Sequence, residues 1–141
     1  MTPAASLRTV LAAIDTGSPV SADAVAAAIG ELRTLQTESA RSMLRRRRAA
    51  AIAALADALA PGARVSARVD AVRRSVRVYV ARWRRVDRFL ADMPISYVGK
   101  PEQYLWSAFS AGSQLDSDDP VPLGKTFLRG ILVSHCNNSD T

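Results

Sequence analysis

The chain of 141 residues is poor in the side chains on which many reactive sites depend, because it has one cysteine and one histidine. Cys136 has no partner for an internal disulfide, which favours a reducing compartment, and we expect a cytoplasmic protein. His135 and Cys136 are adjacent near the C-terminus, and two adjacent ligands are a poor start for a zinc site. Paired carboxylates suited to acid–base chemistry are not evident either. We therefore expect no metal, no cofactor and no enzymatic activity.

Long apolar runs and aromatic residues are also scarce. No stretch approaches the length of about 18 apolar residues that a membrane-spanning helix needs, so we expect no membrane segment. Aromatic residues make up 6% of the chain, while hydrophobic residues as a whole make up 48%. A core built mainly from Leu, Ile, Val and Ala favours packed helices. The length fits a single domain, residues 1–141.

Proline and glycine divide the chain into segments with helical periodicity. An N-terminal helix pair is predicted within 1–38, with helices over 3–16 and from Ser21, a suitable N-cap, to about residue 38. A third helix is predicted over 39–60, where Pro61 and Gly62 end it. Short helices follow within 94–136, one of them beginning at Pro101. Residues 137–141 are predicted to form a frayed tail.

The clearest pattern follows Val65, where an apolar residue recurs every three or four positions. The residues of this stripe are Val69, Val72, Val76, Tyr79, Trp83, Val86, Leu90 and Met93. No glycine or proline interrupts them, which predicts one long helix, although the alternation over 76–80 also fits a strand. The connection over 61–65 is short, so the two helices should fold back on each other. We predict an all-α bundle of about six helices organised around this antiparallel hairpin, residues 39–93.

Basic charge is concentrated in the same hairpin. The net charge is +6, but residues 41–88 hold fourteen arginines and three aspartates, whereas both flanking segments are slightly acidic. Counting outward from the predicted turn places Arg41 near Arg85 and Arg45 near Ala81. The hairpin would thus gather nine guanidinium groups at one end. These belong to Arg41, Arg45, Arg46, Arg47, Arg48, Arg82, Arg84, Arg85 and Arg88.

A crowd of guanidinium groups is suited to phosphate, because each is permanently charged and offers several planar donors. The sequence therefore predicts a non-enzymatic, accessory or regulatory protein that binds nucleic acid, and double-stranded DNA in particular. The alternative is an inhibitor or adaptor that docks its basic end on an acidic surface of a nucleic-acid-processing machine. Trp83 and Tyr79 would stack on bases if exposed, or else pack in the core.

Two further alternatives remain open from the sequence. Arg41 and Arg48 fall on the apolar face of the third helix, so either their alkyl stems reach outward or that end of the helix meets a partner. A homodimer through the seam 69–93 would double the basic patch.

Overall fold

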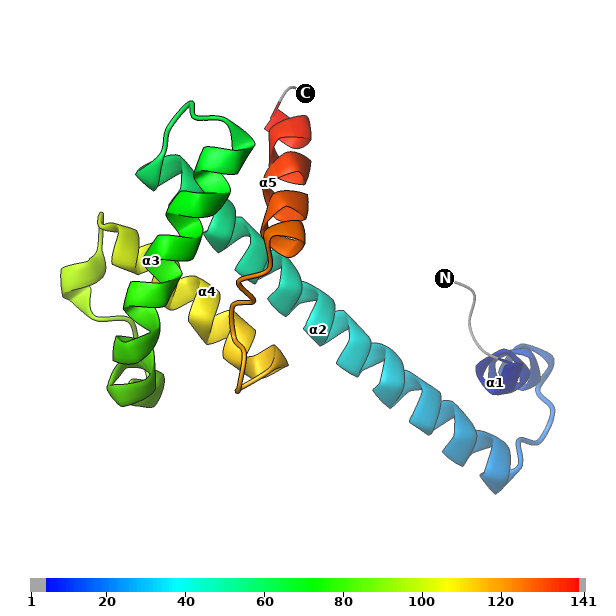
Figure 1. The fold of residues 1–141 in the computed structure, drawn as a ribbon. Coiled ribbons are helices and arrows are strands. Elements are labelled where there is room, and N and C mark those ends of the chain that lie inside the picture. The colour runs from blue at the N-terminus through cyan, green and yellow to red at the C-terminus, as the bar shows by residue number, and fades with distance from the viewer. Residues whose placement is uncertain (1–4, 140–141) are drawn as a thin grey trace. The chain divides into compact units, whose positions relative to one another are not determined.

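The computed structural model describes residues 5–139 and contains helices and no strands in that range, which confirms the predicted all-α class (Figure 1). The described chain forms five α-helices: α1 (Ala5–Thr16), α2 (Ala22–Leu59), α3 (Val65–Arg85), α4 (Pro101–Leu115) and α5 (Lys125–Ser139). Two 3₁₀ turns, η1 (Asp87–Phe89) and η2 (Ile95–Tyr97), lie between α3 and α4. None of these helices is both long and apolar enough to cross a membrane. Pro3, the predicted start of the first helix, lies outside the described residues.

The chain divides into two compact units, residues 1–42 and 43–141. Helix α2 belongs to both, because its 38 residues run through the boundary. The sequence predicted two helices here, meeting near residue 38, but the structure has one. The physical reason is that the stretch from Gln36 to Ser42 contains neither proline nor glycine, so nothing in it ends a helix.

Unit 1, residues 1–42, consists of α1 and the first part of α2. Gly17 follows α1 with a φ of 69°, a left-handed conformation that glycine adopts without strain. The predicted N-cap is confirmed, since the Ser21 hydroxyl accepts a hydrogen bond of 3.1 Å from the Ala24 amide. The two helices are linked where the Leu7 amide, in the first turn of α1, donates to a carboxylate oxygen of Glu31 at 3.1 Å.

Unit 2, residues 43–141, contains the main hydrophobic core. Helix α3 packs against α4 and α5 (Figure 1). The core comprises Ala51, Ile52, Ala53, Leu55, Ala56, Val69, Val72, Val76, Tyr79, Trp83, Leu105, Ala108, Phe109, Val121, Leu128 and Leu132. Within this core the Trp83 ring centroid lies 5.6 Å from that of Trp106 and 5.5 Å from that of Phe109. The α3 seam proposed for a homodimer is therefore occupied by the protein's own helices as far as Trp83.

The predicted antiparallel hairpin over 39–93 is not confirmed. Within unit 2, the C-terminal part of α2 crosses α3 at an angle instead of running beside it (Figure 1). Helix α3 also ends at Arg85 rather than at Met93. The apolar stripe is buried through Trp83, but Val86 and Leu90 are exposed, because the chain leaves the helix at Val86.

A buried carboxylate accompanies this early end of α3. Asp87 is fully buried, and its Oδ2 accepts hydrogen bonds from the Tyr79 hydroxyl at 2.7 Å and the Tyr97 hydroxyl at 2.8 Å. Arg82 places its Nε 3.7 Å from Asp87 Oδ1. A buried charge needs such partners, and the turn after Val86 brings them together from α3, η1 and η2.

The C-terminal helices confirm the predicted start at Pro101 but not the frayed tail predicted from residue 137. Pro101 is the first residue of α4, as predicted. The helix continues past Gly112 to Leu115, and α5 continues through residues 137–139, which were predicted to be a frayed tail. The loop between the two helices carries three aspartates and packs back onto α4 at Gly112.

Candidate nucleic-acid interface

Eight of the nine arginines predicted to form the site lie in unit 2, whereas Arg41 lies in unit 1, where it is exposed. Arg45, Arg46 and Arg47 are exposed on α2, and Arg48 is half-buried. On the other stretch, the exposed residues are Arg82, Arg84 and Arg85 in the last turn of α3 and Arg88 in η1. Arg41 and Arg85 belong to different units, and the hairpin on which their predicted pairing depended is not confirmed.

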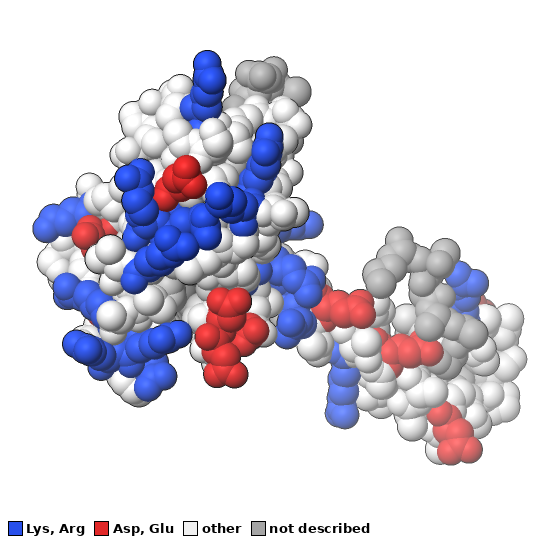
Figure 2. Space-filling view, viewed as in Figure 1, with Lys and Arg blue, Asp and Glu red and all other residues white. Residues whose placement is uncertain are grey.

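The two arginine stretches of unit 2 lie on either side of a loop, residues 116–120, which we call the acidic loop. On the α2 side, Arg48 Nη1 donates a hydrogen bond of 3.1 Å to the Pro120 carbonyl. On the α3 side, Arg84 lines a cavity of about 350 Å³ together with Asp118 and Pro120. Figure 2 shows this arrangement as a red cluster after α4 with blue side chains on both sides. The arginines are thus brought to one region of the surface, but with carboxylates between them.

The carboxylates of the acidic loop form a turn within the loop and no ion pairs in the described chain. Asp116 Oδ1 accepts hydrogen bonds from the amides of Asp118 at 3.0 Å and Asp119 at 3.3 Å. Asp118 and Asp119 are exposed, and no arginine or lysine of the described chain places a nitrogen within 4.0 Å of the loop carboxylates. Their charges therefore act on the surrounding guanidinium groups through solvent.

Arg48 has a structural role within this arrangement. Besides its bond to Pro120, its guanidinium lies over the Phe127 ring, 5.1 Å from the centroid. Burial lowers the pKa of Arg48 from its ordinary value; Asp119 opposes this effect and Arg45 reinforces it. The alkyl stem of Arg48 thus remains within the protein while its charged end reaches the loop, which answers the question left open by its position on the apolar face.

Three more arginines of unit 2 are engaged by neighbours. Arg82 is paired with Asp87 and lies over the Tyr97 ring at 5.2 Å. Arg88 lies over the Phe89 ring at 4.5 Å. Arg68 is buried and paired with Asp57, which also lies 3.6 Å from the His135 ring.

Most of the basic charge is left without a carboxylate partner. Of the fourteen arginines between residues 41 and 88, Arg68 and Arg82 alone have a carboxylate oxygen of the described chain within 4.0 Å. The cluster therefore remains strongly positive in spite of the acidic loop, and this is the property that an anionic ligand would use.

Sequence reasoning missed one arginine of this region. Arg77 is exposed and lines a second cavity of about 350 Å³, together with Arg84, Asp118, Asp119 and Pro120. The spacing could have identified it, because residues seven apart lie within about 20° of each other at about 100° per residue. The hairpin hypothesis concentrated on the end of α3 and passed over its middle.

The aromatic residues do not offer a stacking surface. Tyr79 and Trp83 are buried in the core of unit 2, which excludes the alternative in which they stack on bases. All eight aromatic residues lie within the described chain; Phe89 is 70% exposed, and Tyr104, Trp106 and Phe127 are half-buried.

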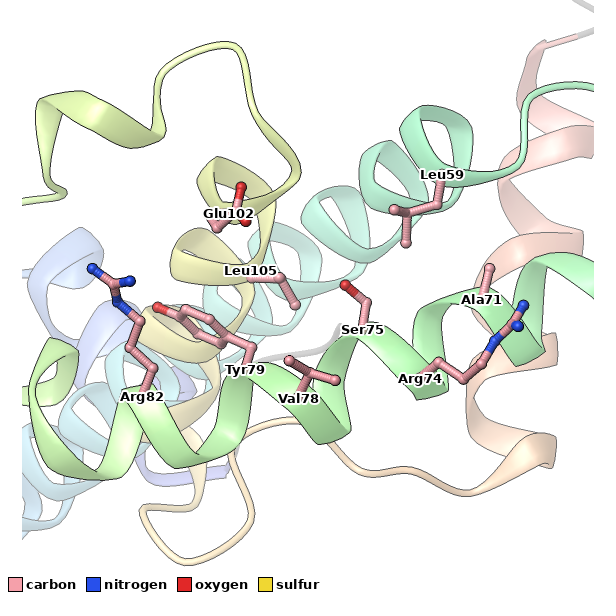
Figure 3. A pocket seen from close by; sticks show the side chains of 9 residues that line it. All are labelled: Leu59, Ala71, Arg74, Ser75, Val78, Tyr79, Arg82, Glu102 and Leu105. Atoms are coloured by element: carbon pink, nitrogen blue, oxygen red, sulfur yellow. The ribbon is translucent and has the colours of Figure 1, made fainter.

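A groove of about 660 Å³ lies on the opposite flank of α3 from the acidic loop. Leu59, Val78 and Leu105 are among its apolar lining residues, and in Figure 3 Arg74 and Arg82 stand at opposite ends of the row of lining residues. Val78, at 80% exposure, lies between these two arginines. The groove extends the basic surface of α3 beyond the acidic loop.

Comparison with known proteins gives no match: no family model, no curated protein and no solved structure is significantly similar to the chain.

Proposed function

We propose that the protein binds nucleic acid, double-stranded DNA in particular, through phosphate contacts from the exposed arginines of unit 2, and that its role is accessory or regulatory. The observation that carries the proposal is the lack of carboxylate partners for most arginines between residues 41 and 88. Contacts with phosphate would come from Arg45, Arg46, Arg47, Arg77, Arg84, Arg85 and Arg88, with Arg48 and Arg82 beside them.

The guanidinium groups of this surface repel one another. Guanidinium groups crowded on one surface raise the free energy of the unliganded protein, and solvent and salt screen only part of this effect. A phosphate backbone relieves the repulsion and releases its own condensed counterions when it binds. Arginine also matches phosphate geometrically, because it donates two parallel hydrogen bonds.

The burial of the aromatic residues favours a duplex over a single strand. Proteins that bind single strands stack bases on exposed aromatic rings, and here Tyr79 and Trp83 are in the core. Contacts limited to phosphates suit a duplex, in which the bases are already stacked. Such contacts position the protein without reading a sequence.

The acidic loop constrains how a duplex would lie. Asp118 and Asp119 repel phosphate, whereas the arginine stretches on both sides attract it. The favoured arrangement places a phosphate backbone against each stretch and turns the loop toward a groove of the duplex.

The test is fluorescence anisotropy with a random-sequence duplex of about 20 base pairs, measured over a series of salt concentrations. If about five phosphates are contacted, the logarithm of affinity should fall with the logarithm of salt concentration with a slope of roughly −4 to −5. Replacing Arg45, Arg46 and Arg47 by glutamine should make the slope shallower by about 2 to 3.

The matched control replaces Arg33, Lys100 and Arg129 by glutamine, which removes the same charge from exposed positions outside the arginine-rich segment. This variant should keep most of the wild-type slope. Absence of binding to duplex DNA, single-stranded DNA and RNA at low salt would reject the proposal. In that case the remaining hypothesis is an acidic protein partner, to be sought by affinity capture.

A further inference from the structure

Unit 1 does not bury enough apolar surface to be stable as an isolated pair of helices. Among the side chains described between residues 7 and 42, Ala28 is the only buried one. Short helices gain most of their stability from packing an apolar face, and here Leu7, Val10 and Leu35 are only half-buried. The exposed large aliphatic residues of this unit are Leu11, Ile14, Val25, Ile29 and Leu32.

These exposed residues are arranged as rows. At about 100° per residue, Val25, Ile29 and Leu32 fall within an arc of about 60° on α2. Leu11 and Ile14 lie about 60° apart on α1. This spacing is typical of a helix face that is buried, yet Leu11 is 49% and Ile14 is 65% exposed. Apolar rows of this kind are buried when another helix packs on them.

The charges beside the α1 row indicate which helix packs on it. Arg8 and Asp15 are both exposed, and their spacing of seven residues places them about 20° apart on one edge of the helix. The midpoint between them falls at Leu11 and Ala12. If two copies of α1 lay antiparallel with a two-fold axis at this midpoint, Arg8 of each copy would face Asp15 of the other.

We propose that unit 1 is a self-association surface, on which a second copy of this chain docks with its α1 antiparallel to the first. The contact is isologous: the aliphatic rows meet, and two Arg8–Asp15 pairs form along one of its edges. Two helix pairs then complete a four-helix bundle, an architecture that buries apolar rows of this kind. Residues 1–40 hold two basic and four acidic side chains, so two copies of this segment repel each other little.

A charge-swap experiment on the full-length protein tests this arrangement, with the molecular mass measured by sedimentation equilibrium in the absence of nucleic acid. The wild type should be a dimer at micromolar concentrations. Arg8→Asp and Asp15→Arg should each weaken the dimer by roughly tenfold or more, because two attractive pairs become repulsive. An equimolar mixture of the two variants should form heterodimers, and the double variant R8D/D15R should dimerise as the wild type does.

Apolar substitutions provide an independent check. Leu11→Asp should yield a monomer whose unit 2 still unfolds cooperatively, while Val78→Asp, at an exposed position of unit 2, should leave the dimer intact. A monomeric wild type at high protein concentration would overturn the proposal. So would a dimer that neither single charge reversal weakens, or a double variant that fails to recover. Because no nucleic acid is present, the outcome does not depend on the function proposed for unit 2.

Discussion

Gly112 and Pro120 are in backbone contact: a Cβ atom placed on residue 112 would lie 1.9 Å from the Pro120 carbonyl oxygen and 2.6 Å from its carbonyl carbon. The same carbonyl accepts the hydrogen bond from Arg48. The acidic loop is therefore held between α4 and α2. Its position among the arginines requires a glycine at residue 112, because a larger residue would collide with Pro120.

Gly112→Ala should lower the free energy of unfolding by roughly 1–3 kcal/mol, because the loop must move away from α4. Gly130→Ala is the matched control, since it changes a glycine within α5 whose added Cβ would meet no atom within 4 Å. That substitution should leave stability unchanged or raise it by up to about 1 kcal/mol. Urea denaturation of both variants measures the difference, and equal stabilities would contradict the close packing.

Arg48 and Arg47 are neighbours in sequence with different expected roles. Arg48→Met should cost about 1–2 kcal/mol of stability, because it removes the bond to Pro120 and the contact with the Phe127 ring. Arg47→Met, at an exposed position, should change stability by less than about 0.5 kcal/mol. Both substitutions remove one positive charge, so both variants should bind duplex DNA more weakly than the wild type. If thermal denaturation found the two variants equally stable, the structural role of Arg48 would be wrong.

The Asp87 network predicts a cost for removing a single hydroxyl. Tyr97→Phe deletes one of the two donors to the buried carboxylate and should lower the free energy of unfolding by roughly 1.5–3 kcal/mol. Tyr104→Phe removes a hydroxyl outside this network and should have little effect. Chemical denaturation at neutral pH compares the two variants.

The same network predicts a loss of stability in alkali. Burial, followed by the hydrogen bond to Asp87, raises the pKa of Tyr79 and of Tyr97. The folded protein thus keeps both phenolic protons where the unfolded chain releases them, above a pH of about 10. The contribution of these groups should be constant below that pH and decrease as the pH rises above it. Melting temperatures of wild type and Tyr97→Phe should therefore converge in alkali; parallel curves would contradict this explanation.

The acidic loop should weaken the binding of DNA. Asp118→Asn with Asp119→Asn removes two negative charges while keeping Asp116, whose carboxylate holds the turn. Affinity for duplex DNA should rise roughly two- to tenfold at moderate salt, because exposed charges are partly screened. Asp23→Asn with Glu38→Gln removes the same charge from unit 1 and serves as the control. Equal affinities of the two double variants would show that the loop does not face the ligand.

Local chemistry along the chain was enough to predict most helices. Apolar periodicity, the stop at Pro61 and Gly62, the N-cap at Ser21 and the first-turn proline at residue 101 all act within one or two turns, so they are readable without the tertiary structure. The same holds for the arginine-rich segment, since composition and spacing are properties of the sequence itself.

The tertiary structure alone decided where α3 ends and what lies between the arginines. Helix α3 stops at Arg85, and just beyond it Asp87 accepts hydrogen bonds from Tyr79 and Tyr97. Apolar spacing does not reveal such polar contacts between residues eight and ten positions apart. The position of the acidic loop likewise depends on Gly112 and Pro120 meeting across α4. Periodicity reports which face of a helix is buried, whereas crossing angles and loop positions depend on how separate faces fit together.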